Sequence, residues 1–436
     1  MKRALFRLLR SVPARQAAIY FGSSSLRAGF AFLMLPVLAA LLGPDGFGLW
    51  ALYRTLLLFM IPVLGLSLHA SIGRGYHRLP PETMRRLIHT CLWFVTAAAV
   101  VALALATPWL LTHETVFSLP TDWLLLIPLV ALLSNVTMVN QSLLRQQQRA
   151  WSYAAYELAG GVLPYLIGLG LIWAGLGWTA LVIGLLAASF CTALGSLWRF
   201  RREDQSRGPL DRTLLLQTLN FSLPLIPHTL GMSMLVLSDR LVLERYSDPA
   251  EVGIYVVGYT LATGLQLVSL PFNNAWSPWV YRQLSLPGGG GRLRVARAYY
   301  LFAGGMVLLA AGWWLLSPLV LRLFFAAEFQ AAQPVLGWVV LGLLFAALHG
   351  SLFPILSDAG RSGALCLVTV SAVVVNLAGC FLLVPRYGML GAAWATMAAY
   401  GVLFLGILVM VQRLSPLPWL AAARSLLARR PPGPAA

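Results

Sequence analysis

Charge is scarce in this chain, and no stretch of it is both long and polar. Charged residues make up 10% of the 436 residues and hydrophobic residues 59%, and the mean hydropathy is +0.78. This composition excludes a soluble domain, which needs a polar surface. The apolar runs are too long and uniform for barrel strands, so the sequence predicts an all-α polytopic membrane protein.

Cysteine and histidine are also scarce. The four cysteines, Cys91, Cys191, Cys366 and Cys380, lie in apolar runs, and their spacing fits neither a disulfide framework nor a metal site. The six histidines are scattered, and the run Pro287-Gly288-Gly289-Gly290-Gly291 lacks the Gly-Lys-Ser/Thr of a phosphate loop. We therefore expect no catalytic residue, no metal, no cofactor and no enzymatic activity.

Acidic residues are half as frequent as basic ones, 14 against 31, which gives a formal charge of +17. A soluble protein this basic would suggest nucleic acid, but here the arginines lie in short loops beside apolar runs, so we expect no nucleic-acid partner. Twenty-five of the 31 lysine and arginine residues lie in the two termini and in the loops that follow even-numbered spans. The odd-numbered loops hold only Arg322 and Arg386, with Arg245 near one, which predicts cytoplasmic N- and C-termini.

Hydropathy predicts twelve spanning helices. Their ranges are 18–42, 47–71, 87–111, 122–144, 152–174, 178–198, 214–245, 251–281, 298–321, 334–356, 363–384 and 389–412. A weak repeat divides them: residues 44–50 match 249–255 at an offset of 205, and residues 107–111 match 317–321 at an offset of 210. Because six spans separate the copies, equivalent helices point the same way.

The repeat predicts two six-helix lobes around a central cavity, with alternating access between them. The expected divisions are an N-terminal lobe (1–198), a cytoplasmic basic linker (199–213), a C-terminal lobe (214–412) and a cytoplasmic tail (413–436).

Two arginines lie inside the first two predicted spans. An arginine in hydrocarbon costs at least about 3 kcal/mol on insertion scales and does not neutralise to avoid that cost. Snorkelling or structural pairing explains one such residue as well as function does. Two in neighbouring helices, Arg27 and Arg54, favour a cationic cavity for an anionic cargo.

Other polar residues in the spans are candidates for ion coupling or gating. Glu157 lies near the inner end of the fifth span, where it can snorkel or pair with a cavity arginine. Asp239 and Arg240 lie about two turns from the outer end of the seventh span. Local compensation, with Arg240 and Glu244 four residues apart, is as good an explanation for them as a coupling role.

Two prolines, Pro224 and Pro227, predict a break in the seventh span, which would make it a moving element. Three aromatic residues, Trp50, Tyr53 and Trp276, are candidates for stacking on sugars, or alternatively for the interfacial belts.

Several short motifs resemble one family. They are residues 42–50 (Leu-Gly-Pro-Asp-Gly-Phe-Gly-Leu-Trp), 238–243 (Ser-Asp-Arg-Leu-Val-Leu), 251–255 (Glu-Val-Gly-Ile-Tyr), 326–329 (Ala-Ala-Glu-Phe), 359–361 (Ala-Gly-Arg) and 387–393 (Tyr-Gly-Met-Leu-Gly-Ala-Ala). Together they resemble the polysaccharide (O-antigen-type) flippases of the multidrug/oligosaccharidyl-lipid/polysaccharide exporter superfamily. Related peptidoglycan lipid flippases also carry arginines in their first two helices, which look like Arg27 and Arg54.

The resemblance implies a flippase that moves an undecaprenyl-diphosphate-linked oligosaccharide, such as an O-antigen or exopolysaccharide unit, across the bacterial inner membrane. It implies membrane lipids and polysaccharide polymerase machinery as further partners. The alternatives are a multidrug exporter of the same superfamily, a peptidoglycan-precursor flippase or, from another class, a membrane glycan polymerase or ligase. An enzyme of that class usually needs a large outer loop, and the longest expected outer loop, 112–122, is short.

Overall fold

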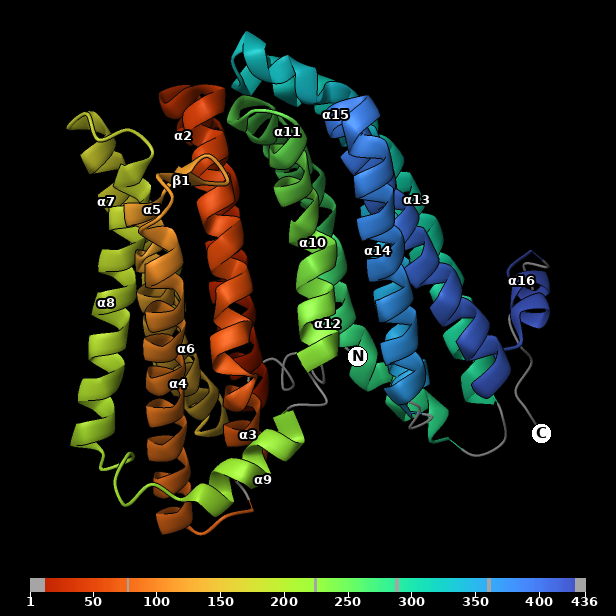
Figure 1. Ribbon diagram of the computed structural model, residues 1–436. Coiled ribbons are helices and arrows are strands. Elements are labelled where there is room, and N and C mark those ends of the chain that lie inside the picture. The colour runs from red at the N-terminus through yellow and green to blue at the C-terminus, as the bar shows by residue number, and fades with distance from the viewer. Residues whose placement is uncertain (1–11, 77, 223–225, 287–289, 359–361, 428–436) are drawn as a thin grey trace. The chain divides into compact units, whose positions relative to one another are not determined.

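The computed structural model describes residues 12–76, 78–222, 226–286, 290–358 and 362–427, nearly all of them helical (Figure 1). The helices are α2 (Val12–Gly65), α3 (Leu68–Gly75), α4 (Pro81–Leu110), α5 (Thr121–Leu124), α6 (Leu126–Gln146), α7 (Ala150–Trp173), α8 (Thr179–Arg202), α9 (Arg212–Ser222), α10 (Ile226–Tyr246), α11 (Pro249–Ala262), α12 (Gln266–Leu284), α13 (Gly290–Phe324), α14 (Gln333–Asp358), α15 (Ser362–Leu414) and α16 (Trp419–Leu427). Short 3-10 helices lie at η2 (Thr263–Leu265) and η3 (Ala327–Ala332).

The two longest helices are each a pair of spans joined at a glycine. Gly43 in α2 and Gly388 in α15 have φ values of +65° and +54°, a region that glycine enters without strain. In α2, Phe30 and Arg54 lie at similar distances along the chain from Gly43 and both contact Tyr165, so the chain folds back at Gly43.

The same reversal occurs in α15. A Cβ at Gly379 would meet Ala395, and one at Gly406 would meet Val368, so the two halves run antiparallel in close contact.

Nine stretches of the described helices are long and apolar enough to cross a membrane. Two of them are the double spans of α2 and α15, and α10 adds a further helix of 21 residues. Its hydropathy is lower because it carries charged residues such as Asp239 and Arg240. These twelve spans match the twelve predicted from the sequence.

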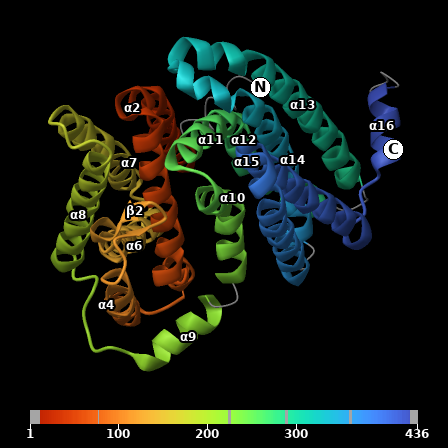
Figure 2. The ribbon, with the colours of Figure 1, turned by 45° about the horizontal axis from the view of Figure 1, so that its top comes forward.

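The seventh span is shorter than predicted. The span expected over 214–245, with a break at its two prolines, is two helices, since α9 ends at Ser222 and α10 begins at Ile226. Helix α9 packs on α3 and α4 and crosses the end of α4 in both views (Figures 1 and 2). The backbone NH of Asp211, just before α9, donates to Thr90 Oγ1 on α4 at 3.2 Å. These contacts hold α9 against α3 and α4.

The loop 112–122 contains a structure that the sequence did not predict. Strands β1 (Thr115–Val116) and β2 (Leu119–Pro120) pair antiparallel across Phe117 and Ser118, which both have positive φ. Strands of two residues are too short to show the alternating pattern that identifies a strand in a sequence.

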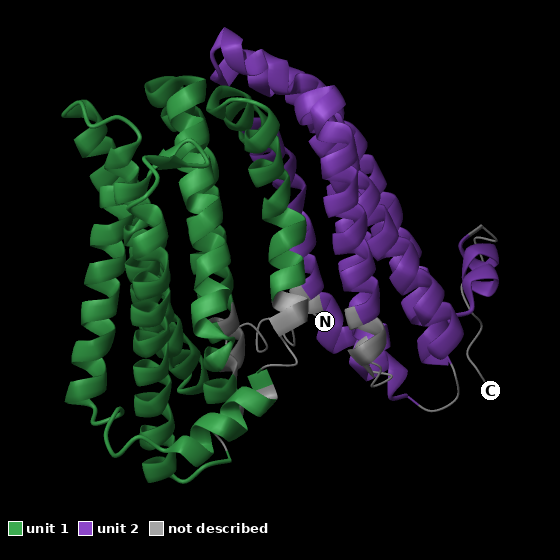
Figure 3. Cartoon of the chain, viewed as in Figure 1, with its two compact units in different colours: residues 1–256 green, residues 257–436 purple. Residues whose placement is uncertain are grey.

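Internal contacts divide the chain into two compact units, residues 1–256 and 257–436 (Figure 3). The first contains α2 to α10 and the start of α11, and the second contains the remaining helices. The lobe and linker boundaries at 198, 213 and 412 were derived from the sequence, and they stay a prediction.

The two turns of the sequence repeat pack on one another within the first unit. A Cβ at Gly48 would lie 1.7 Å from the carbonyl oxygen of Pro249, and a Cβ at Gly253 would lie 2.2 Å from that of Pro44. Pro44 and Pro249, like Gly48 and Gly253, are equivalent at the offset of 205. Reciprocal contacts of this kind indicate a two-fold relation between the two turns. The sequence repeat therefore has a counterpart in the structure.

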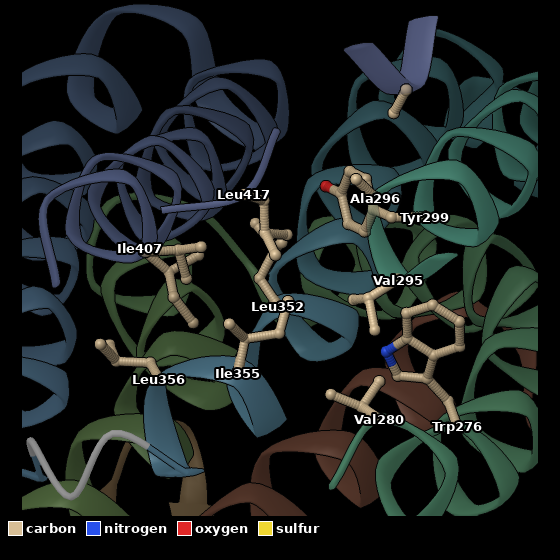
Figure 4. Close-up of a cluster of buried hydrophobic side chains, with 12 residues drawn as sticks. Trp276, Val280, Val295, Ala296, Tyr299, Leu352, Ile355, Leu356, Ile407 and Leu417 are labelled. Carbon is tan, nitrogen blue, oxygen red and sulfur yellow. The ribbon is translucent and has the colours of Figure 1, made fainter. Parts of the chain in front are cut away.

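Each unit has its own hydrophobic core. In the first, side chains from α3, α4, α6 and α8 gather around Leu68, Ile88 and Phe200. In the second, α12 to α16 enclose a cluster that includes Trp276, Tyr299 and Leu352 (Figure 4).

Candidate functional site

Arg27 lies on the first half of α2 and contacts a carboxylate on α7. Its Nε is 3.5 Å from Oε1 of Glu157, and the same oxygen accepts a hydrogen bond of 3.0 Å from Ser24 Oγ. The two partners differ in burial: the Glu157 side chain is 7% exposed and that of Arg27 is 56% exposed. The terminal nitrogens of Arg27 make no ion pair or hydrogen bond with another described residue, so they are free to bind an anion.

Arg54 lies on the second half of α2 and contacts the same helix. Its Nη1 donates a hydrogen bond of 2.7 Å to the phenol oxygen of Tyr165, whose ring also lies 6.0 Å from that of Phe30. Arg54 is exposed, and its partner is neutral. The structure therefore attaches both predicted arginines to α7, at residues eight positions or about 12 Å apart.

The local sequence of α7 explains why it receives both arginines. Tyr153, Glu157, Gly161 and Tyr165 recur every four residues, so they lie along one face of the helix. Gly161 leaves space for the Arg27 stem, because a Cβ there would lie 2.2 Å from Arg27 Cγ. A Cβ at the neighbouring Gly160 would have nothing within 4 Å, so the requirement for glycine is specific to position 161.

Further aromatic and basic groups surround Glu157. Tyr153 interacts with Glu157 and packs edge-on against Tyr20 of α2, with 5.0 Å between ring centroids. The guanidinium of Arg145, at the end of α6, lies 5.7 Å from the Tyr153 ring centroid. We define the arginine site as Arg27, Arg54, Glu157 and Tyr165, with Arg145 as a third nearby cation. It carries net positive charge.

A second arginine cluster, which the sequence did not reveal, lies at the C-terminal end of α8. Arg199 is 8% exposed and donates to Asn140, to Gln147 and, at 3.1 and 3.2 Å, to both oxygens of Glu203. Arg149 also donates to Glu203. The i, i+4 spacing of Arg199 and Glu203 was the available signal, but it does not identify Asn140 on α6 or Gln147 just after that helix as partners.

The pKa of Glu203 follows from these contacts. Partial burial alone would raise the pKa of its carboxyl, but the hydrogen bonds and charges of Arg199 and Arg149 outweigh burial and hold the pKa below its ordinary value. Glu203 is therefore ionised at neutral pH and ties α8 to the loop that precedes α7.

The seventh-span candidates lie in a separate buried cluster. The Asp239 side chain is fully buried, accepts a hydrogen bond from the Tyr255 hydroxyl, and lies 3.3 Å from Nη1 of Arg240. Arg240 also donates to the carbonyl of Val236. The expected Arg240–Glu244 pair is replaced, because Glu244 accepts a hydrogen bond of 2.7 Å from Ser118 in the β1–β2 turn. The coupling or gating role of Asp239 and Arg240 stays a prediction.

The proline candidates differ in what the structure describes. Pro224 lies outside the described residues, and Pro227 is the second residue of α10. The boundary between α9 and α10 falls at these prolines, and their role in gating stays a prediction.

The aromatic residues considered for sugar stacking lie in packed interiors, which corrects that expectation. Tyr53 is fully buried and stacks on Trp50. Trp276 is buried, stacks on Phe272 and donates a hydrogen bond of 2.7 Å to the carbonyl of Ser351. Their sequence positions beside polar residues did not show that each ring has a protein partner.

Comparisons with known proteins give the family. Residues 14–283, more than half of the chain, match the family model described as "Polysaccharide biosynthesis protein". Two Haemophilus influenzae proteins are similar: "Lsg locus putative protein 1", 22% identical over 258 residues, and an "Uncharacterized membrane protein", 23% identical over 260 residues. Each alignment covers 58% of this chain, and the chain spans about six tenths of each relative, 62% and 61%.

Solved structures give the fold. An inward-facing multidrug resistance transporter of the MATE family, in the MOP superfamily, matches with a TM-score of 0.69 and 14% identity, over 89% of this chain and 95% of that one. The lipid II flippase MurJ, in an inward closed conformation, matches with a TM-score of 0.61 and 14% identity, over 92% and 94%. The predicted fold class, an all-α polytopic membrane protein with twelve spans in two lobes, is confirmed. The chain is a multi-pass membrane protein that belongs to the polysaccharide biosynthesis protein family.

Proposed function

We propose that this protein is a flippase for a polyprenyl-diphosphate-linked oligosaccharide, an O-antigen or exopolysaccharide unit, in the bacterial inner membrane. The diphosphate binds at the arginine site, the saccharide crosses with it, and the prenyl chain remains in lipid. Alternating access moves the headgroup from the inner to the outer leaflet, with both termini in the cytoplasm. No covalent step is needed.

One observation carries the proposal: two arginines on spanning helices are attached to one helix and keep donors free. Desolvating two guanidinium groups is costly, and they make too few protein contacts to offset that cost. A diphosphate offers two anionic groups with oxygens in the geometry that a guanidinium fork binds bidentately. Arg27 and Arg54 contact the same face of α7, and in this proposal one diphosphate is bound by both.

Multidrug export is the second candidate, because the MATE transporter gives the higher TM-score of the two folds described. Fold similarity does not decide the cargo, since related folds host different functions. A net positive site repels the cationic compounds that a carboxylate-lined cavity would favour. The arginine site therefore favours an anionic cargo, and the family match favours a saccharide-linked one.

The test is transport in proteoliposomes containing a fluorescent prenyl-diphosphate disaccharide. The double variant Arg27→Ala, Arg54→Ala should lose at least about tenfold of the flipping rate while remaining folded, because both anion-binding groups are gone. Arg207→Ala, which removes an 81% exposed surface arginine, is the matched control and should flip normally. Normal flipping by the double variant would exclude the proposal, and export of a cationic dye by the wild type would support the multidrug alternative.

A further inference from the structure

Arg145, in the last turn of α6, has no acidic partner, unlike the next arginine along the chain. Arg149 is paired with Glu203. Among the described residues, Arg145 forms neither an ion pair nor a hydrogen bond, and its guanidinium lies 5.7 Å from the centroid of the Tyr153 ring. An aromatic ring attracts a cation but offers no lone-pair acceptor, so the N–H donors of Arg145 stay available for an anion.

Tyr153 connects Arg145 with the arginine site. Its hydroxyl is hydrogen-bonded to Glu157, one turn further along α7, and its ring packs on Tyr20. The charges of both Arg145 and Arg27 act on Tyr153. One side chain therefore contacts Arg145 through its ring and the partner of Arg27 through its hydroxyl.

Three arginines contact one face of α7 in succession. Along that face, Arg145 lies against Tyr153, Arg27 against Glu157 and Gly161, and Arg54 against Tyr165. The contacted positions are four residues apart, so each step is about one helical turn, roughly 6 Å, and the row covers roughly 18 Å. That length is more than half of a hydrocarbon core of about 30 Å.

Arg145 lies at the accessible end of this row. It is exposed, and it lies at the end of α6 that the charge count predicts to be cytoplasmic. The Arg54 contact, at Tyr165, lies farthest along α7 from that end. An exposed charge at the rim of a site mainly sets how fast an oppositely charged ligand arrives, whereas a charge inside the site mainly sets how long the ligand stays.

Resting on the proposed function, we infer that Arg145 captures the diphosphate of the cargo from the inner leaflet and passes it to Arg27 and Arg54. Its free N–H donors bind the arriving anion without breaking a contact to a protein carboxylate. The diphosphate then moves about one turn along α7 to reach Arg27. Arg145 acts on arrival, and it is not one of the groups that hold the cargo in the arginine site.

The experiment measures binding kinetics by stopped flow, with a fluorescent short-chain prenyl-diphosphate disaccharide and the purified full-length protein in detergent. At low salt, Arg145→Gln should lower the association rate constant at least about threefold and leave the dissociation rate constant within about twofold of wild type. Added salt should slow association to the wild type more than to the variant, because salt screens a steering charge. Arg145→Lys keeps the charge and should associate nearly as fast as the wild type.

Arg202→Gln is the matched control. Arg202 lies in the last turn of α8, is exposed like Arg145, and has its guanidinium 5.1 Å from the centroid of the Trp198 ring. Glu203, directly after α8, pairs with Arg149, so the ends of α6 and α8 lie on the same side of the unit. The control therefore loses the same charge and the same kind of contact on that side, but against its own helix, and it should associate like the wild type.

A second comparison separates capture from holding. Arg54→Gln, inside the site, should raise the dissociation rate constant instead of lowering the association rate constant. If Arg145→Gln does not fold, Arg145→Met, which keeps the apolar length of the side chain without the charge, takes its place.

The outcomes distinguish this inference from the proposed function. If Arg145→Gln leaves association unchanged, or slows it no more than Arg202→Gln does, the inference is wrong and the proposed function stands. If Arg145→Gln acts on dissociation, as Arg54→Gln should, Arg145 holds the cargo and does not capture it, so the inference is again wrong. If the wild type does not bind the probe, the proposed function fails and the inference fails with it.

Discussion

Arg27 and Arg199 both lie on spanning helices of the same compact unit, and both contact a glutamate, yet their surroundings are opposite. Arg199 is nearly buried and directs all three of its guanidinium nitrogens at protein acceptors, namely Asn140, Gln147 and Glu203. Arg27 is more than half exposed and contacts its glutamate through Nε alone, at 3.5 Å.

The difference separates two uses of an intramembrane arginine. A guanidinium has five N–H donors in a fixed plane, and a structural arginine satisfies them with protein groups. An arginine that keeps its terminal nitrogens free, despite the cost of placing it in a span, is arranged for a ligand. The number of satisfied donors, more than burial or pairing, distinguishes the two.

The largest expected effect concerns stability. Arg199→Ala leaves Glu203, Asn140 and Gln147 without their shared donor, so the free energy of unfolding should fall by about 3–5 kcal/mol. Arg27→Ala should cost about 1 kcal/mol or less, because the Arg27 side chain is more than half exposed and contacts Glu157 through Nε alone, at 3.5 Å. Thermal unfolding in detergent measures both. A larger loss for Arg27→Ala than for Arg199→Ala would reverse the distinction.

The next effect concerns the shape of the cation. Lysine in place of Arg27 or Arg54 keeps the charge but loses the planar fork, so each variant should flip cargo about tenfold more slowly than wild type, equivalent to about 1.4 kcal/mol. Both should remain better than the corresponding alanine variants. Flipping rates in proteoliposomes provide the comparison, and full activity of both lysine variants would mean that the site uses charge alone.

A smaller effect tests the space at Gly161 that holds the aliphatic part of the Arg27 side chain. Gly161→Ala places a methyl group 2.2 Å from Arg27 Cγ, which must shift, so cargo affinity should fall severalfold. Stability should change little, because alanine favours a helix over glycine by about 1 kcal/mol and offsets the crowding. Gly160→Ala, with open space around its methyl group, should gain stability without affecting binding. Equal binding by both variants would show that the position of Arg27 is unimportant.

The smallest effect is a pH dependence of the structural arginine cluster. The pKa of Glu203 is lowered in the folded protein, so its stabilising contribution is complete above the ordinary value of 4.5 and is lost as the pH falls through the lowered pKa. Glu203→Gln should flatten the stability profile below that pH. Melting temperatures of the two proteins between pH 6 and pH 3 would provide the measurement, and parallel profiles would contradict this role.

The sequence predicted more of the fold than of the candidate site. Each apolar run long enough to span was recognised, including those on either side of Gly43 and Gly388, because lipid requires every backbone group to be satisfied within a helix. The seventh span was overextended to 214–245 because α9 is apolar enough to continue the hydrophobic run, although it packs on α3 and α4 as a separate helix. A hydropathy pattern shows which segments are apolar, but it does not show where a helix ends and the next one takes another direction.

At the candidate site the sequence identified individual residues but not their partners. Arg27, Arg54 and Glu157 stood out because each is costly in a span. Nothing in the chain order connects Arg54 with Tyr165, 111 positions later, or distinguishes Gly161 from Gly160. The Arg199 cluster was missed because arginines at the ends of spans are expected on topological grounds alone.

By itself, the sequence determined that this protein lies in a membrane, how many times it crosses, and that it carries costly positive charge within its first two spans. Those properties follow from the local balance between apolar and charged residues along the chain. Only the tertiary structure decided which arginine meets a carboxylate, which meets a phenol and which is fully satisfied. The partner of each arginine depends on which helices pack together. The sequence shows only that an arginine lies in a span, and not which group it contacts.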